Sequence, residues 1–170
     1  MAVAYFITFT AYGTWLHGSP KGQGSVDAEH NVYGTPFVEP DAQREQQARE
    51  AMVQPPYVMG PSQRAIVCQA IVQLAQERGW NLLAAHIRSN HVHVVVSAQR
   101  DPGRIMSDMK ARASRDLTLA GFDTAERRRW TRHGSTQHLF REEEIEAKIR
   151  YTLDEQGDRM AWYAKEPRTK

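Results

Sequence analysis

The chain of 170 residues lacks several features that mark particular classes of protein. Its single cysteine, Cys68, excludes an internal disulfide, and its place in an apolar helical stripe is typical of a reduced thiol in a cytosolic protein. No apolar run approaches the roughly 18 residues of a membrane span. The first residues carry no basic segment of the kind that opens a signal peptide. We therefore expect a cytoplasmic protein that does not cross a membrane.

Net charge is also small, +2, and by itself indicates no charged partner. The basic residues are unevenly placed, however, because Arg127, Arg128, Arg129 and Arg132 surround Trp130. Arginine clusters neutralise phosphates, and an indole can stack on a base. This segment is therefore a candidate nucleic-acid contact. A solvated loop with its tryptophan tucked into the core is the alternative.

Composition and periodicity predict one α+β domain spanning 1–170. With 41% hydrophobic and 25% charged residues, the chain is long enough to bury a core. The pattern predicts strands over 3–12, 80–88, 91–98 and 135–140, and helices from Ser62 as N-cap to Gly79, from Asp101-Pro102 to Gly121, and from Arg141 to about Gly157. The order β-α-β-β-α-β plus a terminal helix is that of a ferredoxin-like (RRM-like) antiparallel sheet with two helices on one face.

Residues 13–62 form an irregular insertion, because glycines and prolines interrupt nearly all of it. Only 41–52 could be helical, and that stretch is polar almost throughout. A long insertion in a compact domain is more often functional than decorative. It could cover the sheet or help to grip a substrate.

The segment Asn90-His91-Val92-His93 carries the strongest chemical signal. Side chains alternate along a strand, so His91 and His93 share one face, about 7 Å apart along the strand. Valines 92, 94 and 96 share the other face. If the valines face the two helices, the histidines face the open side of the sheet, where two imidazoles can bind one divalent metal ion. A pair of surface histidines on a half-buried strand is the alternative.

The last predicted helix has two features that its packing does not explain. Gln156 falls on the apolar stripe at 100° per residue, and Tyr151 lies off that stripe with Lys148 and Glu155. Both suggest a functional site. The alternative is that Tyr151 covers surface and Gln156 caps the end of the helix. The stripe itself consists of Ile145, Ile149, Thr152, Leu153 and Gln156.

Together, the His-apolar-His strand, the ferredoxin-like order and the late tyrosine followed by glutamine resemble the HUH single-strand DNA transposases with one catalytic tyrosine. That family includes the REP-associated tyrosine transposases. The opening segment 5–16 is also similar to the start of proteins of this group. The resemblance implies that His91 and His93 bind Mg²⁺ or Mn²⁺ and that Tyr151 attacks a phosphodiester in single-stranded DNA. The products would be a 5′-phosphotyrosine link and a free 3′-hydroxyl, with no nucleotide cofactor.

The third metal ligand departs from the family's pattern. The usual spacing places an amide ligand four residues after the tyrosine, on the same helical face. Here Glu155 holds that position and Gln156 follows it. Carboxylate and amide oxygens can both bind Mg²⁺. The sheet-facing stripe favours Gln156, and the spacing from Tyr151 favours Glu155.

The resemblance also implies partners. These are hairpin ends of mobile or repeat DNA with a flanking single strand, a possible homodimer that exchanges the tyrosine helix, and a bacterial, nucleoid-associated location when DNA is bound. Charge and position make several side chains candidate DNA contacts, namely Arg112, Arg115, Arg128, Arg129, Trp130 and Arg132.

Two other functions are compatible with these residues. A metal-dependent phosphodiesterase would use a bound hydroxide and form no covalent intermediate. An RRM-like module would bind nucleic acid without cleaving it, but such modules carry aromatic residues on a central strand, and His91–Val96 has none.

Overall fold

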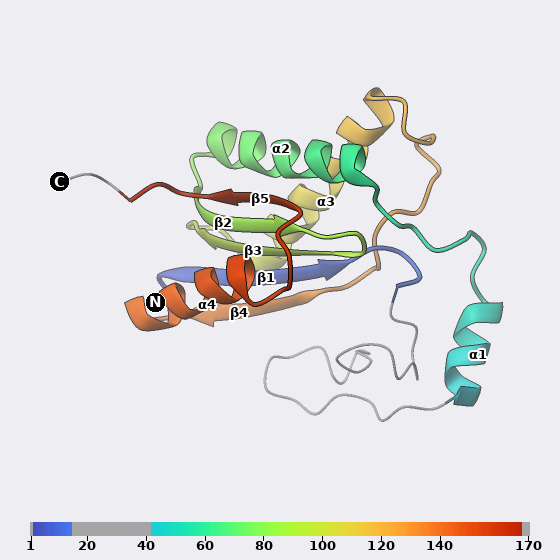
Figure 1. Cartoon of the computed structure of the whole chain (residues 1–170), viewed down its shortest axis with the longest axis horizontal. Coiled ribbons are helices and arrows are strands. Elements are labelled where there is room, and N and C mark those ends of the chain that lie inside the picture. Colours follow the sequence, from blue (N-terminus) through green and yellow to red (C-terminus); the bar gives the residue numbers. More distant parts are fainter. Residues whose placement is uncertain (1, 15–41, 168–170) are drawn as a thin grey trace.

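The computed structural model of the chain describes residues 2–14 and 42–167, and it confirms the predicted order of elements. A short helix within the insertion and a short last strand are additional. The elements are β1 (Ala4–Thr10), α1 (Ala42–Glu50), α2 (Pro61–Arg78), β2 (Asn81–Ile87), β3 (His91–Ser97), α3 (Pro102–Leu119), β4 (Ser135–Leu139), α4 (Glu142–Asp154) and β5 (Ala161–Ala164) (Figure 1).

The five strands form one antiparallel sheet in the order β4-β1-β3-β2-β5. The first four of these strands have the neighbours of the predicted ferredoxin-like sheet, with β1 and β3 in the centre. The edge strand β5 extends the sheet beside β2 and was not predicted. Its four residues are too few to show a period of two, so only pairing with β2 identifies them as a strand.

The two faces of the sheet are covered differently. Helices α2 and α3 pack on one face, where Val92, Val94 and Val96 are fully buried with Ile7 and Phe9. The expectation that these valines face the two helices is therefore confirmed. Helix α4 lies against the opposite face, which is not open along its whole length (Figure 1). Its contacts there include Leu153 against a second cluster of buried residues, Ala4, Ala84, Val95 and Leu139.

Local signals account for the start of α3 and the end of α2, but not for the start of α2. Asp101 caps α3, because its Oδ1 accepts from the backbone N–H of Arg104 (3.0 Å). Gly79 ends α2 in the left-handed region at φ 66°, a conformation that favours glycine. The prediction of Ser62 as N-cap is wrong, since Gly60 takes that place and Pro61 follows as the first helical residue. Proline suits this position because its missing N–H would have no intrahelical partner.

Part of the predicted insertion belongs to the core. Tyr57 and Met59 are buried, and their backbone N–H groups donate to Tyr12 O (2.9 Å) and Ser89 O (2.7 Å). The segment before α2 therefore closes the domain beside the β2–β3 hairpin. Helix α1 has no buried residue, in keeping with its polar sequence. The rest of the predicted insertion, 15–41, lies outside the described residues.

Two expectations drawn from composition can be compared with this fold. Among the helices of the described residues, none combines the length and apolar character that a membrane span requires. Cys68 lies half-buried on α2, and burial raises the pKa of its thiol to about 11. A thiol with so high a pKa stays protonated and unreactive near neutral pH.

Replacing Gly134 with alanine is expected to destabilise the fold by roughly 1–3 kcal/mol, because the new Cβ would overpack the start of β4. That atom would lie 2.4 Å from Met106 Sδ and 2.6 Å from the backbone oxygen of Thr8. The methionine can move, but Thr8 O belongs to a central strand. Urea unfolding measures the change. Gly60→Ala is the control, since its Cβ would approach only Gln63 Oε1, at 3.4 Å. Equal stability of the two variants would contradict this account.

Candidate active site

The histidines of β3 lie together on the face against which α4 packs. The ring centroids of His91 and His93 are 4.8 Å apart, and the rings are nearly perpendicular at 79°. His93 is only 6% exposed, whereas His91 is half-buried. The alternation of side chains along the strand accounts for this placement, because the intervening Val92 is buried on the helix-covered face.

Each imidazole is held at its Nδ1 atom. Nδ1–H of His91 donates to Oδ1 of Asn90 (2.7 Å), which fixes the proton on Nδ1 and leaves a lone pair on Nε2. Nδ1 of His93 lies 2.9 Å from the Thr8 hydroxyl, which can donate or accept and therefore supports either tautomer. Hydrogen bonds at Nδ1 of this kind orient histidine ligands in metal sites.

Gln156 reaches the histidines from the turn that follows α4. Nε2–H of His93 donates to Oε1 of Gln156 (3.1 Å). The prediction that the helix runs to about Gly157 is wrong, because α4 ends at Asp154 and Gln156 lies on no helical stripe. Gly157 turns the chain at φ 78°.

Glu155 does not reach the histidines. It is the exposed C-cap of α4, and its Oε1 lies 3.8 Å from Nε of Arg150. The geometric argument for Glu155 assumed a helix that continues past Tyr151 for a further full turn. Since the helix stops first, the structure brings Gln156 to the histidine pair and leaves Glu155 outside it.

Tyr151 projects from α4 toward the same cluster. Its ring meets those of His93 and Phe6 edge-on, with centroids 5.7 Å and 5.8 Å away. Lys148, one turn earlier, places its Nζ 5.3 Å from the Tyr151 ring and 4.7 Å from the Phe6 ring. The structure thus unites His91, His93, Gln156 and Tyr151, with an ammonium group beside the tyrosine.

Burial keeps both histidines neutral. It lowers the pKa of His91 to about 4, with a further contribution from the positive charge of Arg88. It lowers the pKa of His93 to about 3, and the neighbouring His91 adds to that shift. The side chain of Gln156 raises the pKa of both histidines, but burial outweighs it. Neutral imidazoles are the form that binds metal ions.

These shifts predict a loss of stability in mild acid. The unfolded chain binds protons on its histidines as pH falls below about 6.5, while folded His93 resists protonation until about pH 3. The stabilisation is therefore complete above pH 6.5 and declines as pH falls toward 3, by roughly 2 kcal/mol for His93 between pH 7 and pH 5. Urea unfolding across that range measures it. A free energy of unfolding that stays constant from pH 7 to pH 5 would contradict the prediction.

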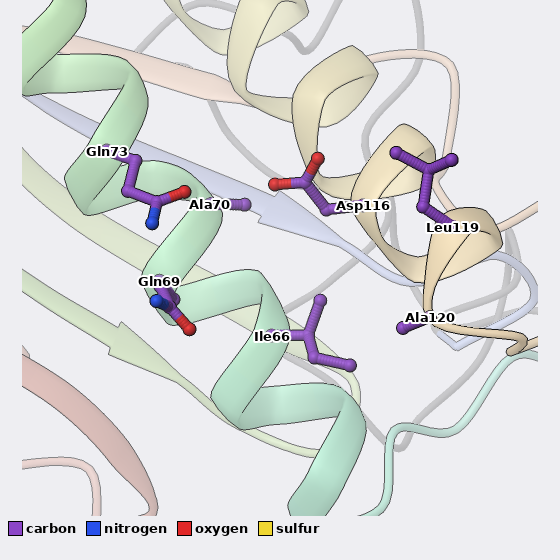
Figure 2. Close-up of a pocket in the computed structure, with 7 residues that line it drawn as sticks. All are labelled: Ile66, Gln69, Ala70, Gln73, Asp116, Leu119 and Ala120. Carbon is purple, nitrogen blue, oxygen red and sulfur yellow. The ribbon is translucent and has the colours of Figure 1, made fainter.

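A pocket on the other side of the sheet is separate from this cluster. It lies between α2 and α3, the helices that cover the valine face (Figure 2). The sheet therefore stands between the pocket and the histidines. Its lining residues are Ile66, Gln69, Ala70, Gln73, Asp116, Leu119 and Ala120.

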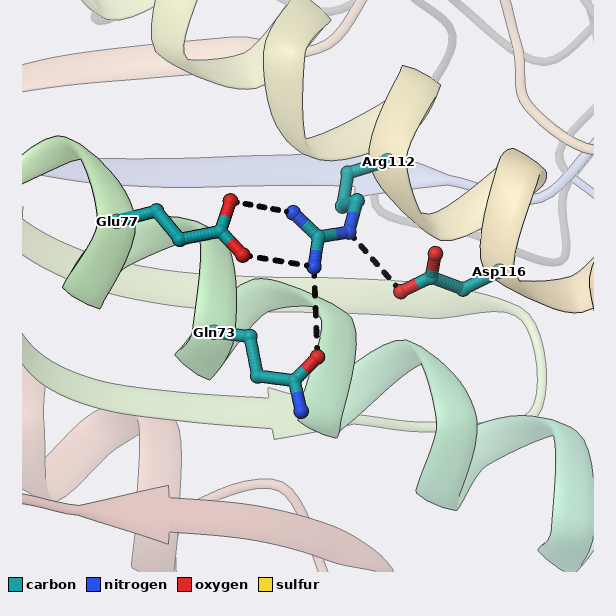
Figure 3. Close-up of polar contacts among 4 residues, drawn as sticks. All are labelled: Gln73, Glu77, Arg112 and Asp116. Atoms are coloured by element: carbon teal, nitrogen blue, oxygen red, sulfur yellow. Dashed lines mark hydrogen bonds and ion pairs between the residues drawn. The ribbon is translucent and has the colours of Figure 1, made fainter.

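Arg112 lies beside that pocket and forms ion pairs with two carboxylates there. It donates to Glu77 (2.8 Å and 3.1 Å) and to Asp116 (3.1 Å), and its third contact is Gln73 (Figure 3). These contacts join α2 to α3. Arg115 is exposed on the same helix, α3. The structure thus places neither predicted DNA contact in the histidine cluster.

The arginine-rich segment is partly buried. Arg129 is only 3% exposed and donates to Thr118 Oγ1 (2.9 Å) and Phe122 O (2.7 Å), so its guanidinium is engaged by the chain itself. Trp130 lies edge-on to Phe9, with centroids 5.2 Å apart, on the face that α2 and α3 cover. For Arg129 and Trp130 the structure therefore supports the alternative to a nucleic-acid contact, in which the tryptophan packs into the core. Arg128 and Arg132 are exposed.

His86 is a residue of this region that the sequence did not reveal. It is fully buried on β2 opposite His93, and its Nδ1–H donates to Thr152 O (2.9 Å). Its Nε2 accepts from the backbone N–H of Met160 (3.0 Å). The imidazole therefore ties the end of α4 and the approach to β5 to the sheet. A lone histidine in an apolar strand carries no motif that predicts this role.

The fold and the cluster define an α+β protein in which a helix-borne tyrosine faces a strand-borne histidine pair. The family model described as "Transposase IS200 like" matches residues 58–149, more than half of the chain. The chain belongs to this family and is an enzyme of the transposase class. The matched range contains the histidines and ends just before Tyr151. The resemblance to transposases is thereby confirmed.

The chain was also compared with curated proteins and with solved structures. No curated protein matches the chain. Among solved structures, the chain is similar to one titled "Structure of the REP associates tyrosine transposase bound to a REP hairpin", with 9% sequence identity and a TM-score of 0.48. The match covers 92% of this chain and 70% of that one.

Proposed function

We propose that this transposase is a metal-dependent single-stranded DNA endonuclease and strand transferase that acts through a 5′-phosphotyrosine intermediate. The observation that carries the proposal is the convergence of Tyr151 on His93, whose Nε2 lies 3.1 Å from Gln156 Oε1. A nucleophile and three candidate metal ligands thus meet in one place. Membership of the transposase family supports the assignment.

The residues fit a hard divalent ion such as Mg²⁺ or Mn²⁺. No cluster of three or more His, Cys, Asp or Glu side chains suited to a metal occurs in residues 2–14 and 42–167, so the third protein ligand would be the amide oxygen of Gln156. His91 and His93 would supply neutral nitrogen ligands oriented by Asn90 and Thr8. When bound, the ion polarises the phosphodiester and stabilises the charge that develops there.

Tyr151 would carry the covalent step. Its hydroxyl oxygen attacks the phosphorus, the new O–P bond forms, and the bond from phosphorus to the 3′-oxygen breaks. The phenol loses its proton and the departing 3′-oxygen gains one, which leaves a 5′-phosphotyrosine and a 3′-hydroxyl. A 3′-hydroxyl from another strand reverses the reaction and completes strand transfer. Lys148 offers a positive charge close to the attacked phosphate.

We take the substrate to be a DNA hairpin with a flanking single strand. Arg128 and Arg132 are exposed cations that could contact its phosphates. Arg132 follows Thr131, whose hydroxyl lies 2.9 Å from that of Thr10, a neighbour of His91 across the sheet. A homodimer that exchanges α4 remains a prediction.

Labelled hairpin DNA incubated with the protein and Mn²⁺, then separated on a denaturing gel, tests the proposal. We expect a protein-linked DNA band that requires the metal. Cleavage without a linked band would instead support a hydrolytic phosphodiesterase. Binding without cleavage under every metal would support a non-catalytic module.

A further inference from the structure

The register of the sheet extends the histidine cluster toward β5. His93 is opposite His86, and His86 is opposite Trp162, so three side chains lie in a row across β3, β2 and β5 on one face. Arg88 lies two residues beyond His86 on that face, and its backbone N–H donates to His91 O (2.9 Å). Directly opposed side chains in such a sheet are about 5 Å apart at Cβ. Arg88 and Trp162 therefore lie on the face that carries the histidines, next to the buried His86.

Arg88 is a cation without a counter-charge among the described residues. Its Nη1 donates to the backbone oxygen of Asp158 (3.0 Å), and no carboxylate in residues 2–14 or 42–167 forms an ion pair with it. Its neighbour Arg159, by contrast, is paired with Asp154 at 2.6 Å. A guanidinium that is anchored but not neutralised is suited to bind an anion.

Trp162 is an exposed indole that its neighbours hold in place. It is 46% exposed on the edge strand, and the guanidinium of Arg159 lies 4.5 Å from its ring centroid. Arg159 in turn donates to Leu153 O (3.1 Å) and to Asp154. These contacts restrain one side of the ring, while the exposed remainder offers an apolar surface. Such a preorganised aromatic surface next to a cation is the typical platform for a nucleobase.

We propose that Arg88 and Trp162 form a nucleotide subsite, in which Arg88 binds a backbone phosphate of the single strand and Trp162 stacks a neighbouring base. The strand would then leave the histidine cluster toward β5, past the turn that covers His86. This inference rests on the proposed function and names a substrate contact of the same site. In a nucleotide strand each phosphate lies next to a base, and here the cation Arg88 lies next to the aromatic ring of Trp162.

Binding of a labelled oligothymidylate of about 12 nucleotides, measured by fluorescence anisotropy at several salt concentrations, tests the subsite. The protein is the full chain with Tyr151→Phe and no added metal, so that no cleavage intervenes. Adding Arg88→Gln should reduce the slope of log K against log salt by about 0.7, the loss of one phosphate contact. Adding Trp162→Leu should weaken binding roughly tenfold at every salt concentration, with the slope unchanged. Trp162→Phe should restore most of that affinity.

Matched controls come from the far edge of the sheet. Phe140 is 57% exposed beyond β4, and Arg141 is exposed at the start of α4. Phe140→Leu and Arg141→Gln should leave affinity and slope unchanged. Full affinity in Trp162→Leu, or equal losses in the control variants, would overturn the subsite.

Formation of the covalent protein–DNA product is measured separately, on the protein with Tyr151 intact. If that protein forms no DNA-linked band while Arg88→Gln and Trp162→Leu still lose binding as expected, the proposed reaction fails and the subsite stands. If the band forms but both variants bind like their parent, the subsite alone fails.

Discussion

Tyr151→Phe is expected to abolish the covalent protein–DNA product, with a loss on the order of a thousandfold or more, and to leave DNA binding intact. The change removes only the phenolic oxygen, the atom that would attack the phosphorus. The aromatic ring that meets His93 and Phe6 remains, so the packing of α4 on the sheet should survive. The denaturing gel measures the product, and anisotropy measures binding.

Tyr163→Phe is the matched control for this experiment. Tyr163 lies on β5 but belongs to the face that α2 and α3 cover, and it packs against the main core. Removing its hydroxyl should leave the linked band at its original intensity. A band that persists in Tyr151→Phe would exclude the tyrosine mechanism, and cleavage that persists without a band would favour hydrolysis by a metal-bound hydroxide.

His91→Ala should remove metal binding and, with it, the linked product, to an extent similar to loss of the nucleophile. His91 is the better target of the pair because it is half-buried, whereas His93 is 6% exposed and its loss would leave a cavity. Titration calorimetry with Mn²⁺ measures binding, and the gel measures the product. Chelation of the metal should have the same effect on the unmodified protein.

His138→Ala is the control for that variant, because His138 is exposed on β4, which β1 separates from the histidine-bearing strand β3. It should bind Mn²⁺ with unchanged affinity. If His91→Ala retained both its affinity for Mn²⁺ and the linked product, the histidine pair would not be the metal site, and the role assigned to Gln156 would fall with it.

Local patterns were sufficient to predict much of this fold. The alternation in His91–Ser97 assigned the histidines and valines to opposite faces, and Asp101-Pro102 located the start of α3. These signals depend on a residue and its immediate neighbours, through side-chain alternation or capping, so they can be read without knowledge of the fold. The same local signals failed at the end of α4, where apolar periodicity continued past the helix to Gln156.

The sequence by itself determined the order of elements, the pairing of His91 with His93, and the presence of a tyrosine on a late helix. Only the tertiary structure decided which oxygen approaches the histidines, because a turn after Asp154 carries Gln156 to them and leaves Glu155 beside Arg150. It also decided that Arg129 is buried, while Arg88 lies beside the site and has no ion-pair partner among the described residues. The physical reason is that these outcomes depend on contacts between segments far apart in the chain, where burial and pairing select among side chains of the same type.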